Sequence, residues 1–188
     1  MSDFPSPDST APHLGTLDWQ PATSRPELLA VPVLAALNDG GPSCFVAPID
    51  PELADTAAFC EAYDVPLAVS ANCVVVAGRR GEHNTMAACL VLATDRADVN
   101  KTVRRHLDVR KISFASMADA TSRTGMEYGG ITPVGLPADW PVLVDAAVAA
   151  APWVVVGSGI RGSKILISGA DTAALTGATV LELAQPSA

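Results

Sequence analysis

The sequence has few aromatic residues, no long apolar run and no leader-like start. Aromatic side chains make up 5% of the 188 residues although 49% are hydrophobic, so we expect a core of mostly Ala, Val, Leu and Ile. No apolar run reaches the roughly 18 residues typical of a transmembrane helix. The N-terminus has neither the basic end nor the apolar stretch of a signal peptide. These absences predict a cytoplasmic protein that does not contact a membrane.

Common metal and nucleophile motifs are also missing. The four cysteines form no CxxC or CxH spacing, and the three histidines stand alone in polar segments. We therefore expect reduced, buried thiols, surface histidines and no metal site. There is no GxSxG elbow, no HExxH and no acid pair. The stretch GSGIRG fits GxGxxG, but a strand rather than a helix is expected after it, which disfavours a dinucleotide fold. No cofactor is expected.

Basic residues are scarce in the first 70 positions, where Arg25 stands against ten acidic residues. The remaining 118 positions are nearly balanced, and residues 101–111 hold five basic residues against Asp108 alone. The net charge of −8 argues against nucleic-acid binding by bulk charge. A local basic patch can still meet a phosphate backbone, and a solvated helix face is the alternative interpretation.

The order of the expected elements predicts an α+β fold. Residues 1–23 are rich in Pro, Ser, Thr and Asp and are expected to form a disordered N-terminal tail, followed by a single domain over 24–188. Hairpins outnumber clear βαβ units. The pattern therefore favours a central mixed, largely antiparallel β-sheet flanked by helices.

Individual elements are predicted from caps and periodicity. Residues 67–94 should form a long hairpin. Helices are expected over 50–63, capped by Asp50 with Pro51 in its first turn, and over 96–107. A further helix should begin after Ser116 and end at Gly125. Residues 141–150 are ambiguous between helix and strand.

Two glycine-rich loops, EYGGITPVG at 127–135 and VVGSGIRG at 155–162, carry little side-chain chemistry. Glycine allows a positive φ and lets a ligand approach the backbone closely. Pro133 fixes its own φ and restricts Thr132 to extended conformations. An array of fixed N–H groups could bind an oxyanion or a carbonyl oxygen. A pair of purely structural turns is the alternative interpretation.

Several segments, in order, resemble the YbaK / prolyl-tRNA-synthetase-associated editing domain family. The resemblance covers about Asp50 to Leu183, and the GxxxP loop from Gly129 to Pro133 is its most specific part. The matching segments are DPELADTAAFCEAYDVP, ANCVVVAG, CLVLATDRADVNKTVRRHLDVRKISFAS, TGMEYGGITPVGLP and VVVGSGIRGSKILISGADTAALTGA.

The resemblance implies a trans-acting aminoacyl-tRNA deacylase. Such an enzyme hydrolyses the ester between a wrongly attached amino acid and the 3′ end of a tRNA, without a metal. Backbone amides of the GxxxP loop would hold the aminoacyl group, and the terminal ribose hydroxyl of the substrate would help to activate water. The implied partners are the aminoacyl-adenosine end of a mischarged tRNA and an aminoacyl-tRNA synthetase.

The resemblance also assigns roles to residues. The implied catalytic residues are Asn72, Gly129 and Gly130. The implied substrate-binding residues are Thr132, Pro133, Gly157, Ser158, Gly159, Arg161 and Lys164. The basic surface for the RNA strand would include Arg79, Arg80, Arg104 or Arg105, whose charges position phosphates rather than read bases.

One position departs from the family pattern. Many members carry a Lys where this chain has Asn72, and Asn has no charge. Three interpretations are open: Asn72 serves a variant deacylase in which Lys164 or Arg161 supplies charge, it marks a non-catalytic aminoacyl-tRNA or nucleotide-binding module, or it is only a polar strand residue. Lys164 could instead be an exposed strand residue. Asp145 points into the site or braces local backbone, and we favour bracing.

A third functional class stays open beside the enzyme and the binding module. The acidic N-terminal segment could make the chain an accessory protein that binds a partner through residues 1–23.

Overall fold

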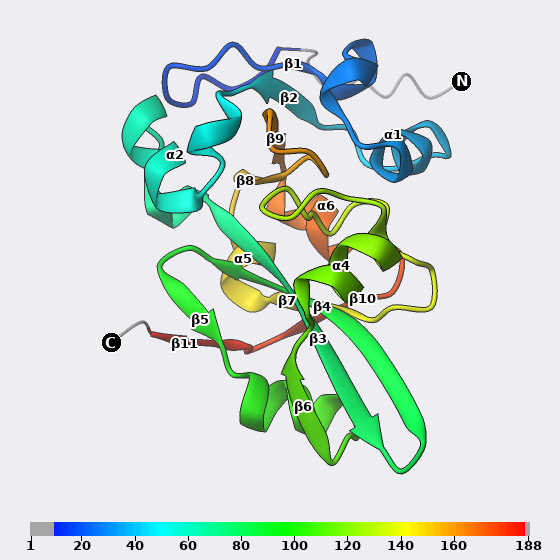
Figure 1. Ribbon diagram of the computed structural model, residues 1–188. Helices are drawn as coiled ribbons and strands as arrows, with labels where there is room; N and C mark the ends of the chain where they lie inside the picture. The colour runs from blue at the N-terminus through cyan, green and yellow to red at the C-terminus, as the bar shows by residue number, and fades with distance from the viewer. Residues whose placement is uncertain (1–9, 187–188) are drawn as a thin grey trace, which may run out of the picture.

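The computed structural model describes residues 10–186, and its strands form two main sheets and one small pair (Figure 1). The first sheet is antiparallel throughout. In spatial order it contains β1 (Gln20–Pro21), β2 (Phe45–Pro48), β9 (Ser163–Ile167) and β8 (Val154–Gly157).

The second sheet is mixed. In spatial order it contains β10 (Ala178–Leu181), β7 (Val142–Asp145), β4 (His83–Leu92), β3 (Ala71–Arg80) and β6 (Lys111–Phe114). β7 runs parallel to both β10 and β4, and the other pairs are antiparallel. The small pair is β5 (Asp95–Ala97) with β11 (Ala184–Pro186). A bridge between Ser70 and Val155 joins the two main sheets.

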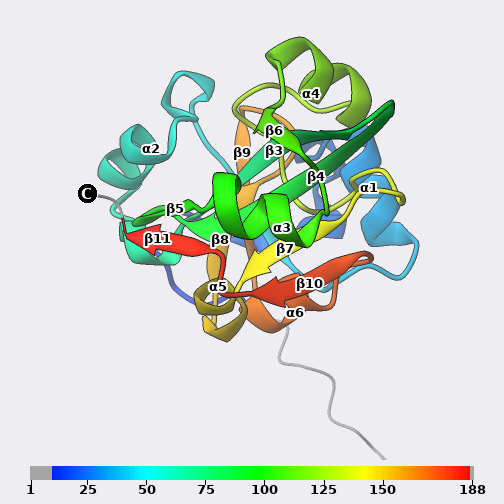
Figure 2. The same cartoon turned by 90° about the horizontal axis from the view of Figure 1, so that it is seen from below.

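Short helices surround these sheets (Figures 1 and 2). The α-helices are α1 (Val31–Asn38), α2 (Thr56–Tyr63), α3 (Arg104–His106), α4 (Met117–Thr124), α5 (Ala146–Ala150) and α6 (Gly169–Ala173). Single turns of 3-10 helix occur at Ala22–Ser24, Pro26–Leu28, Pro51–Leu53 and Leu67–Val69, and a π-helix at Val99–Val103. The α+β class with mixed sheets and flanking helices is confirmed.

The core consists mostly of aliphatic side chains, as the composition predicts. The largest cluster joins α1 and the strands of both sheets through residues such as Val33, Val46, Leu90 and Ile165. Buried aromatic residues are few and include Phe59. Because the site described below lies where the two sheets meet, this aliphatic core holds both of its walls in place.

The local predictions are met where the capping signals are clear. The hairpin of β3 and β4 pairs from Ala71 with Leu92 to Arg80 with His83. Ser116 caps α4 by accepting a hydrogen bond from Asp119 N, and Gly125 ends it with φ of 67°. The ambiguous segment at 141–150 is both elements in turn, β7 followed by α5.

Two predicted helices differ from the structure. Residues 50–63 do not form one helix, because Asp50 caps only the turn Pro51–Leu53 and Asp55 caps a separate helix, α2. Residues 96–107 begin inside strand β5, which pairs with β11. A π-helix and the short α3 follow. In each case a second cap or a distant strand overrides the periodic pattern.

The structure also differs from the expected disordered tail over residues 10–23, whereas residues 1–9 lie outside the described part. Trp19 is buried and donates its indole N–H to the carbonyl of Leu14 at 2.9 Å. β1 pairs with β2. This segment therefore packs against the first sheet.

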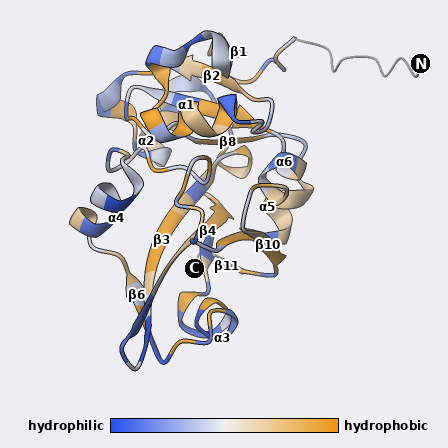
Figure 3. Ribbon diagram, turned by 90° about the vertical axis from the view of Figure 1, so that its right-hand side faces the viewer, coloured by the Kyte–Doolittle hydropathy of each residue, from blue (hydrophilic) through white to orange (hydrophobic). Residues whose placement is uncertain are grey.

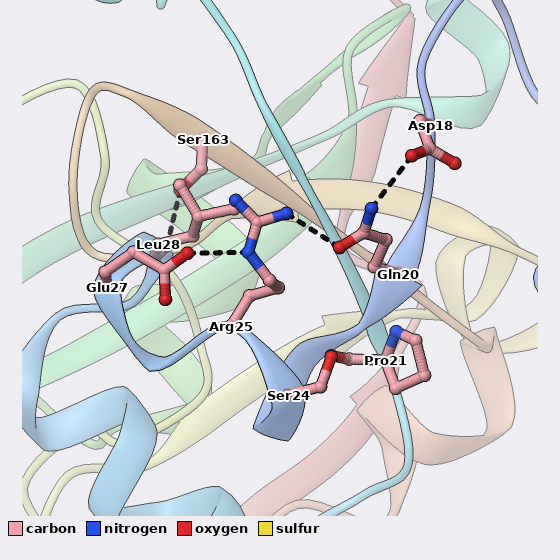
Figure 4. Close-up of polar contacts among 8 residues, drawn as sticks. All are labelled: Asp18, Gln20, Pro21, Ser24, Arg25, Glu27, Leu28 and Ser163. Atoms are coloured by element: carbon pink, nitrogen blue, oxygen red, sulfur yellow. Dashed lines mark hydrogen bonds and ion pairs between the residues drawn. The ribbon is translucent and has the colours of Figure 1, made fainter.

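Polar contacts fix the neighbouring turns to the sheet (Figure 4). Arg25 donates to Glu27 at 2.6 Å and to Gln20 at 2.7 Å. The hydroxyl of Ser163, on β9, donates to the carbonyl oxygen of Leu28. The N-terminal segment is thereby joined to the strand that leads from the second glycine loop.

The remaining sequence expectations concern single residues. His13, His83 and His106 are exposed, and no group of His, Cys, Asp or Glu within residues 10–186 is arranged to hold a metal ion. All four cysteines are free, and all except Cys73 are buried. No helix in the same range combines the length and apolarity needed to cross a bilayer.

Candidate active site

A cavity of about 420 Å³ lies between the start of β3, the N-terminal end of α2 and the two glycine loops. Five of the ten predicted site residues line it: Asn72, Gly129, Gly157, Arg161 and Lys164. The other residues around it are Ala54, Asp55, Thr56, Ala71, Cys73, Val74, Val75, Phe114, Ala115, Ala120, Tyr128 and Ile131.

The two glycine loops contact each other through their backbones. Gly159 N–H donates to the carbonyl oxygen of Gly130 at 2.7 Å, and Glu127 N–H donates to that of Gly159 at 2.8 Å. A Cβ on Gly157 would lie 2.4 Å from Gly130 O and 2.7 Å from Ile131 O. Glycine is needed at Gly157 because the opposing backbone leaves no space for a side chain.

The loop amides are not equally available to a ligand. Gly130 N–H already donates to Glu127 O at 2.9 Å, and Gly130 is buried. Gly129 and Ile131 line the cavity, and their N–H groups have no acceptor among residues 10–186. Gly129 is exposed and has φ of 87°. The amides of Gly129 and Ile131 are therefore the better candidates for binding a substrate oxygen.

Asn72 stands at the start of β3 and faces the cavity. Its side-chain oxygen accepts a hydrogen bond of 2.7 Å from the hydroxyl of Thr56, the first residue of α2. With Oδ1 engaged, the Nδ2 group is left to donate, and it has no acceptor among the described residues. The pair places a neutral hydrogen-bond donor in the cavity wall.

Lys164 lies in the same wall and is buried, which rules out the exposed-strand interpretation. Its ammonium group donates to Ala54 O at 2.8 Å and lies 5.2 Å from the centre of the Phe59 ring. Burial lowers its pKa from 10.5, and the charge of Arg161 lowers it further, against the opposing effects of Cys60 and Asp55. The cavity wall thus holds a cation on β9 as well as the neutral amide of Asn72.

This burial predicts a pH dependence of stability. Because the pKa of Lys164 is lower in the folded protein, the unfolded chain binds the proton more tightly. Stability should then rise with pH between the lowered pKa and 10.5. We expect the free energy of unfolding, measured in urea at several pH values, to increase with pH more strongly in wild type than in Lys164→Met. The exposed Lys101→Met variant is the control, and parallel curves for all three proteins would contradict the prediction.

Arg161 closes one side of the cavity. Its guanidinium donates to Pro51 O at 2.9 Å and to Tyr128 O at 3.4 Å, and its backbone N–H donates to the Glu127 carboxylate at 2.7 Å. These contacts join the glycine loops to the turn before α2. The Arg161 side chain therefore holds the walls together and also presents positive charge to the cavity.

Neither a free carboxylate base nor a reactive thiol faces the cavity among the described residues. Asp55 is the one carboxylate in the lining, and it caps α2 through Ala57 N and Ala58 N. Burial raises the pKa of the Cys73 thiol well above its usual range, with a further contribution from Cys89. The thiol stays neutral, so it is a poor nucleophile. Beside a largely apolar lining, the cavity consequently presents the backbone and amide N–H donors together with the cations of Arg161 and Lys164.

The other five predicted residues do not line the cavity. Thr132, Ser158 and Gly159 are buried, and Ser158 shares a 2.6 Å hydrogen bond with Ser163. Pro133 contributes to a different hollow, beside α1 and α6. These residues support the loops on the side away from the cavity.

Sequence reasoning missed Thr56, Phe114 and Tyr128. The sequence pattern puts Thr56 inside a helix, whereas the structure puts it at the start of α2. The signal that locates this start is the second capping residue, Asp55. No local signal marks Phe114 and Tyr128. Asp145 lies outside the cavity lining and braces the backbone: it accepts hydrogen bonds from Ala147 N, Leu183 N and Ala184 N at 2.8–3.0 Å.

Comparison with known families identifies the family of the chain. The family model of the aminoacyl-tRNA editing domain matches residues 50–175, about two thirds of the chain. The chain therefore belongs to the aminoacyl-tRNA editing domain family. Membership indicates a role in aminoacyl-tRNA editing, a deacylase activity that protects the fidelity of translation. No curated protein matches the chain.

Solved structures show the same fold. A crystal structure of a proposed trans-editing enzyme for prolyl tRNA synthetase has a TM-score of 0.71 and 23% identity, covering 83% of this chain and 96% of the other. A crystal structure of a hypothetical protein has a TM-score of 0.72 and 18% identity, covering 82% and 99%. A protein scaffold used for epitope grafting has a TM-score of 0.70 and 23% identity, covering 83% and 97%.

Proposed function

We propose that this protein is a free-standing aminoacyl-tRNA deacylase, with the aminoacyl-adenosine end of a mischarged tRNA in the cavity. The carrying observation is the composition of the cavity wall, in which unpaired donors at Gly129, Ile131 and Asn72 accompany the cation of Lys164. Donors of this kind stabilise negative charge on an ester oxygen during hydrolysis. The neighbour described as a trans-editing enzyme for prolyl tRNA synthetase has the same fold.

The proposed reaction uses the chain's amides and a hydroxyl of the substrate. The N–H groups of Gly129 and Ile131 and the amide of Asn72 donate to the ester carbonyl as it becomes a tetrahedral oxyanion. As water adds to the carbonyl carbon, it passes a proton to the neighbouring ribose hydroxyl, which passes its own proton to the ester oxygen of the ribose. The bond between the carbonyl carbon and that ester oxygen breaks, which releases the free amino acid and the tRNA with both ribose hydroxyls restored. Lys164 and Arg161 attract the terminal phosphate.

The decisive test is deacylation of a panel of mischarged tRNAs. We expect wild type to release at least one amino acid, at the same rate with and without EDTA. Metal independence is proposed because the donor set in the cavity lacks a free carboxylate or imidazole among residues 10–186. Failure to hydrolyse any member of a panel covering all amino acids would contradict the proposed activity, and inhibition by EDTA would contradict the mechanism.

Asn72→Ala tests the role of the amide. Loss of one donor to an oxyanion costs about 10²–10³ in rate, so we expect kcat to fall by about that factor. Asn100→Ala, an exposed residue outside the cavity, is the matched control. Equal rates for Asn72→Ala and wild type, with both proteins folded, would mean that Asn72 is only a polar strand residue.

A second candidate function is an aminoacyl-tRNA-binding module without turnover. It is favoured by the neutral Asn72 and by the existing bond between Lys164 and Ala54 O, which leaves the ammonium partly engaged. Asn72→Lys separates the two functions. If wild type is inert but the Lys variant hydrolyses, the chain has lost the activity and kept the pocket. If both bind tRNA and neither hydrolyses it, the binding module is the better description.

A further inference from the structure

The active-site cavity has one carboxylate in its lining, and the reaction proposed above gives it no role. Asp55 stands immediately before α2, is exposed to solvent and belongs to the cavity lining. The other charged side chains in the lining are the cations of Arg161 and Lys164. Asp55 is therefore the one lining residue whose charge attracts a positively charged part of a ligand.

The fold uses only one oxygen of the Asp55 carboxylate. Oδ1 accepts hydrogen bonds from the backbone N–H groups of Ala57 at 3.1 Å and Ala58 at 3.5 Å, which caps α2. Oδ2 has no hydrogen-bond donor among residues 10–186, and no cation lies within ion-pair distance of the carboxylate in that part of the chain. The cap thus fixes the position of Asp55 and leaves its second oxygen available.

Two neutral acceptors in the lining are already engaged. Asn72 Oδ1 accepts a hydrogen bond from the hydroxyl of Thr56 at 2.7 Å. The carbonyl oxygen of Ala54 accepts one from the ammonium group of Lys164 at 2.8 Å. A hydrogen bond to an ionised acceptor is roughly twice as strong as one between neutral groups. Oδ2 of Asp55 is thus the better partner for a cation that enters the cavity.

The surroundings of the cavity strengthen such a pair. Figure 3 shows that β3 is hydrophobic along most of its length, and that the hydrophilic tip of the hairpin it forms with β4 lies away from α2. Ala71, Val74 and Val75 of β3 belong to the cavity lining. Charges that are partly shielded from water by apolar side chains are screened less by salt than charges in open solvent.

An aminoacyl ester brings a positive charge of its own into the cavity. Its α-amino group is two bonds from the ester carbonyl carbon and is protonated below a pKa of about 8. The ammonium group must therefore enter the cavity whenever the loop amides hold the ester. Arg161 and Lys164 repel it, whereas a carboxylate within about 4 Å attracts it.

We propose that Asp55 binds the α-ammonium group of the substrate, so that the site accepts esters of free amino acids and rejects esters whose amine is acylated. The inference rests on the proposed function, since it concerns the substrate of the same cavity. Acylation removes the positive charge and adds a group that faces the carboxylate. The protein would then spare tRNA that carries an N-formylated or a peptidyl group.

Binding of a non-hydrolysable analogue tests the proposal without depending on hydrolysis. The probe is 3′-(L-alanylamino)-3′-deoxyadenosine, in which an amide replaces the ester. It is compared with its N-acetylated form by isothermal titration calorimetry at about pH 6.5, where the free amine is protonated. We expect wild type to bind the free amine at least about fivefold more tightly, which corresponds to the roughly 1 kcal/mol of a partly exposed ion pair.

Asp55→Asn is the informative variant, because Asn caps a helix about as well as Asp but carries no charge. We expect circular dichroism to show an intact fold, and the variant to bind the two probes with equal affinity. Asp50→Asn is the matched control, because Asp50 caps the turn Pro51–Leu53 and does not line the cavity. It should keep the preference of wild type for the free amine.

Several outcomes would overturn the proposal. They are equal affinity of wild type for the two probes, no binding of either probe, and an unchanged preference in Asp55→Asn. If wild type also hydrolyses mischarged tRNA in these cases, the deacylase stands and Asp55 only caps α2. A preference that depends on Asp55, in a wild type that hydrolyses no ester, would support the role of Asp55 and count against the deacylase.

Discussion

Replacing Gly157 by Ala is expected to lower deacylation at least about 100-fold and to destabilise the protein. A Cβ at this position would lie 2.4 Å from Gly130 O and 2.7 Å from Ile131 O. Both atoms belong to backbone, so neither can turn aside as a flexible side chain would. The two glycine loops must separate, which moves the amides of Gly129 and Ile131 that line the cavity.

The size of the effect follows from the geometry. Displacement of a catalytic group by about 1 Å can cost about 10² in rate. Overpacking costs about 1–3 kcal/mol in stability, which lowers Tm by about 2–12 °C in a chain of this length. The measurements are single-turnover deacylation at a temperature where the variant is folded, and thermal unfolding followed by circular dichroism.

Gly162→Ala is the matched control for Gly157→Ala. Gly162 is the last residue of the same loop, but its added Cβ would meet only Pro51 Cγ, at an ordinary 3.8 Å. We expect its activity and Tm to stay near those of wild type. Full activity in Gly157→Ala would show that the loops need not touch for the reaction. Equal losses in both variants would show that any change in this loop is harmful.

Asp145→Ala is expected to produce the largest loss of stability, about 3–5 kcal/mol. The buried carboxylate accepts hydrogen bonds from Ala147 N at the start of α5 and from Leu183 N and Ala184 N near β11. Each buried donor left without a partner costs about 1–3 kcal/mol. Thermal unfolding should therefore show a fall in Tm of about 6–20 °C.

Asp139→Ala serves as the control, because Asp139 is exposed and accepts no side-chain hydrogen bond among the described residues. Its Tm should match that of wild type. Asp145 lies outside the cavity, so the reaction should persist in Asp145→Ala below its lowered Tm. A stable but inactive Asp145→Ala would place the carboxylate in the reaction and contradict the bracing role.

The sequence predicts elements well where a few neighbouring residues decide the structure. Ser116 and Gly125 mark both ends of α4 because capping is a local interaction. The β3–β4 hairpin is equally clear from alternating apolar stretches and a polar turn. By contrast, residues 95–97 form a strand only because β11, almost ninety positions later, supplies its partner. The periodicity of neighbouring residues cannot predict a pairing with a strand so far away in the sequence.

In the site, too, neighbouring residues predict some features and distant contacts decide the others. Glycine-rich composition identifies the two loops, because glycine allows a positive φ and close contact between backbones. Which face of each loop meets the cavity depends on tertiary packing, which is why Gly129 and Gly157 line it while Thr132 and Ser158 are buried behind. The exposure of Phe114 and Tyr128 is likewise fixed by distant elements.

The strands that pair with β9 and β7 show that the folding unit is larger than the family segment. Residues 50–175 contain β9 and β7 but neither β2, which pairs with β9, nor β10, which pairs with β7. An unpaired strand edge invites association with other chains. The segments outside the family match thus act as built-in protection against aggregation, and a shortened protein that keeps every residue of the cavity would still lose that protection.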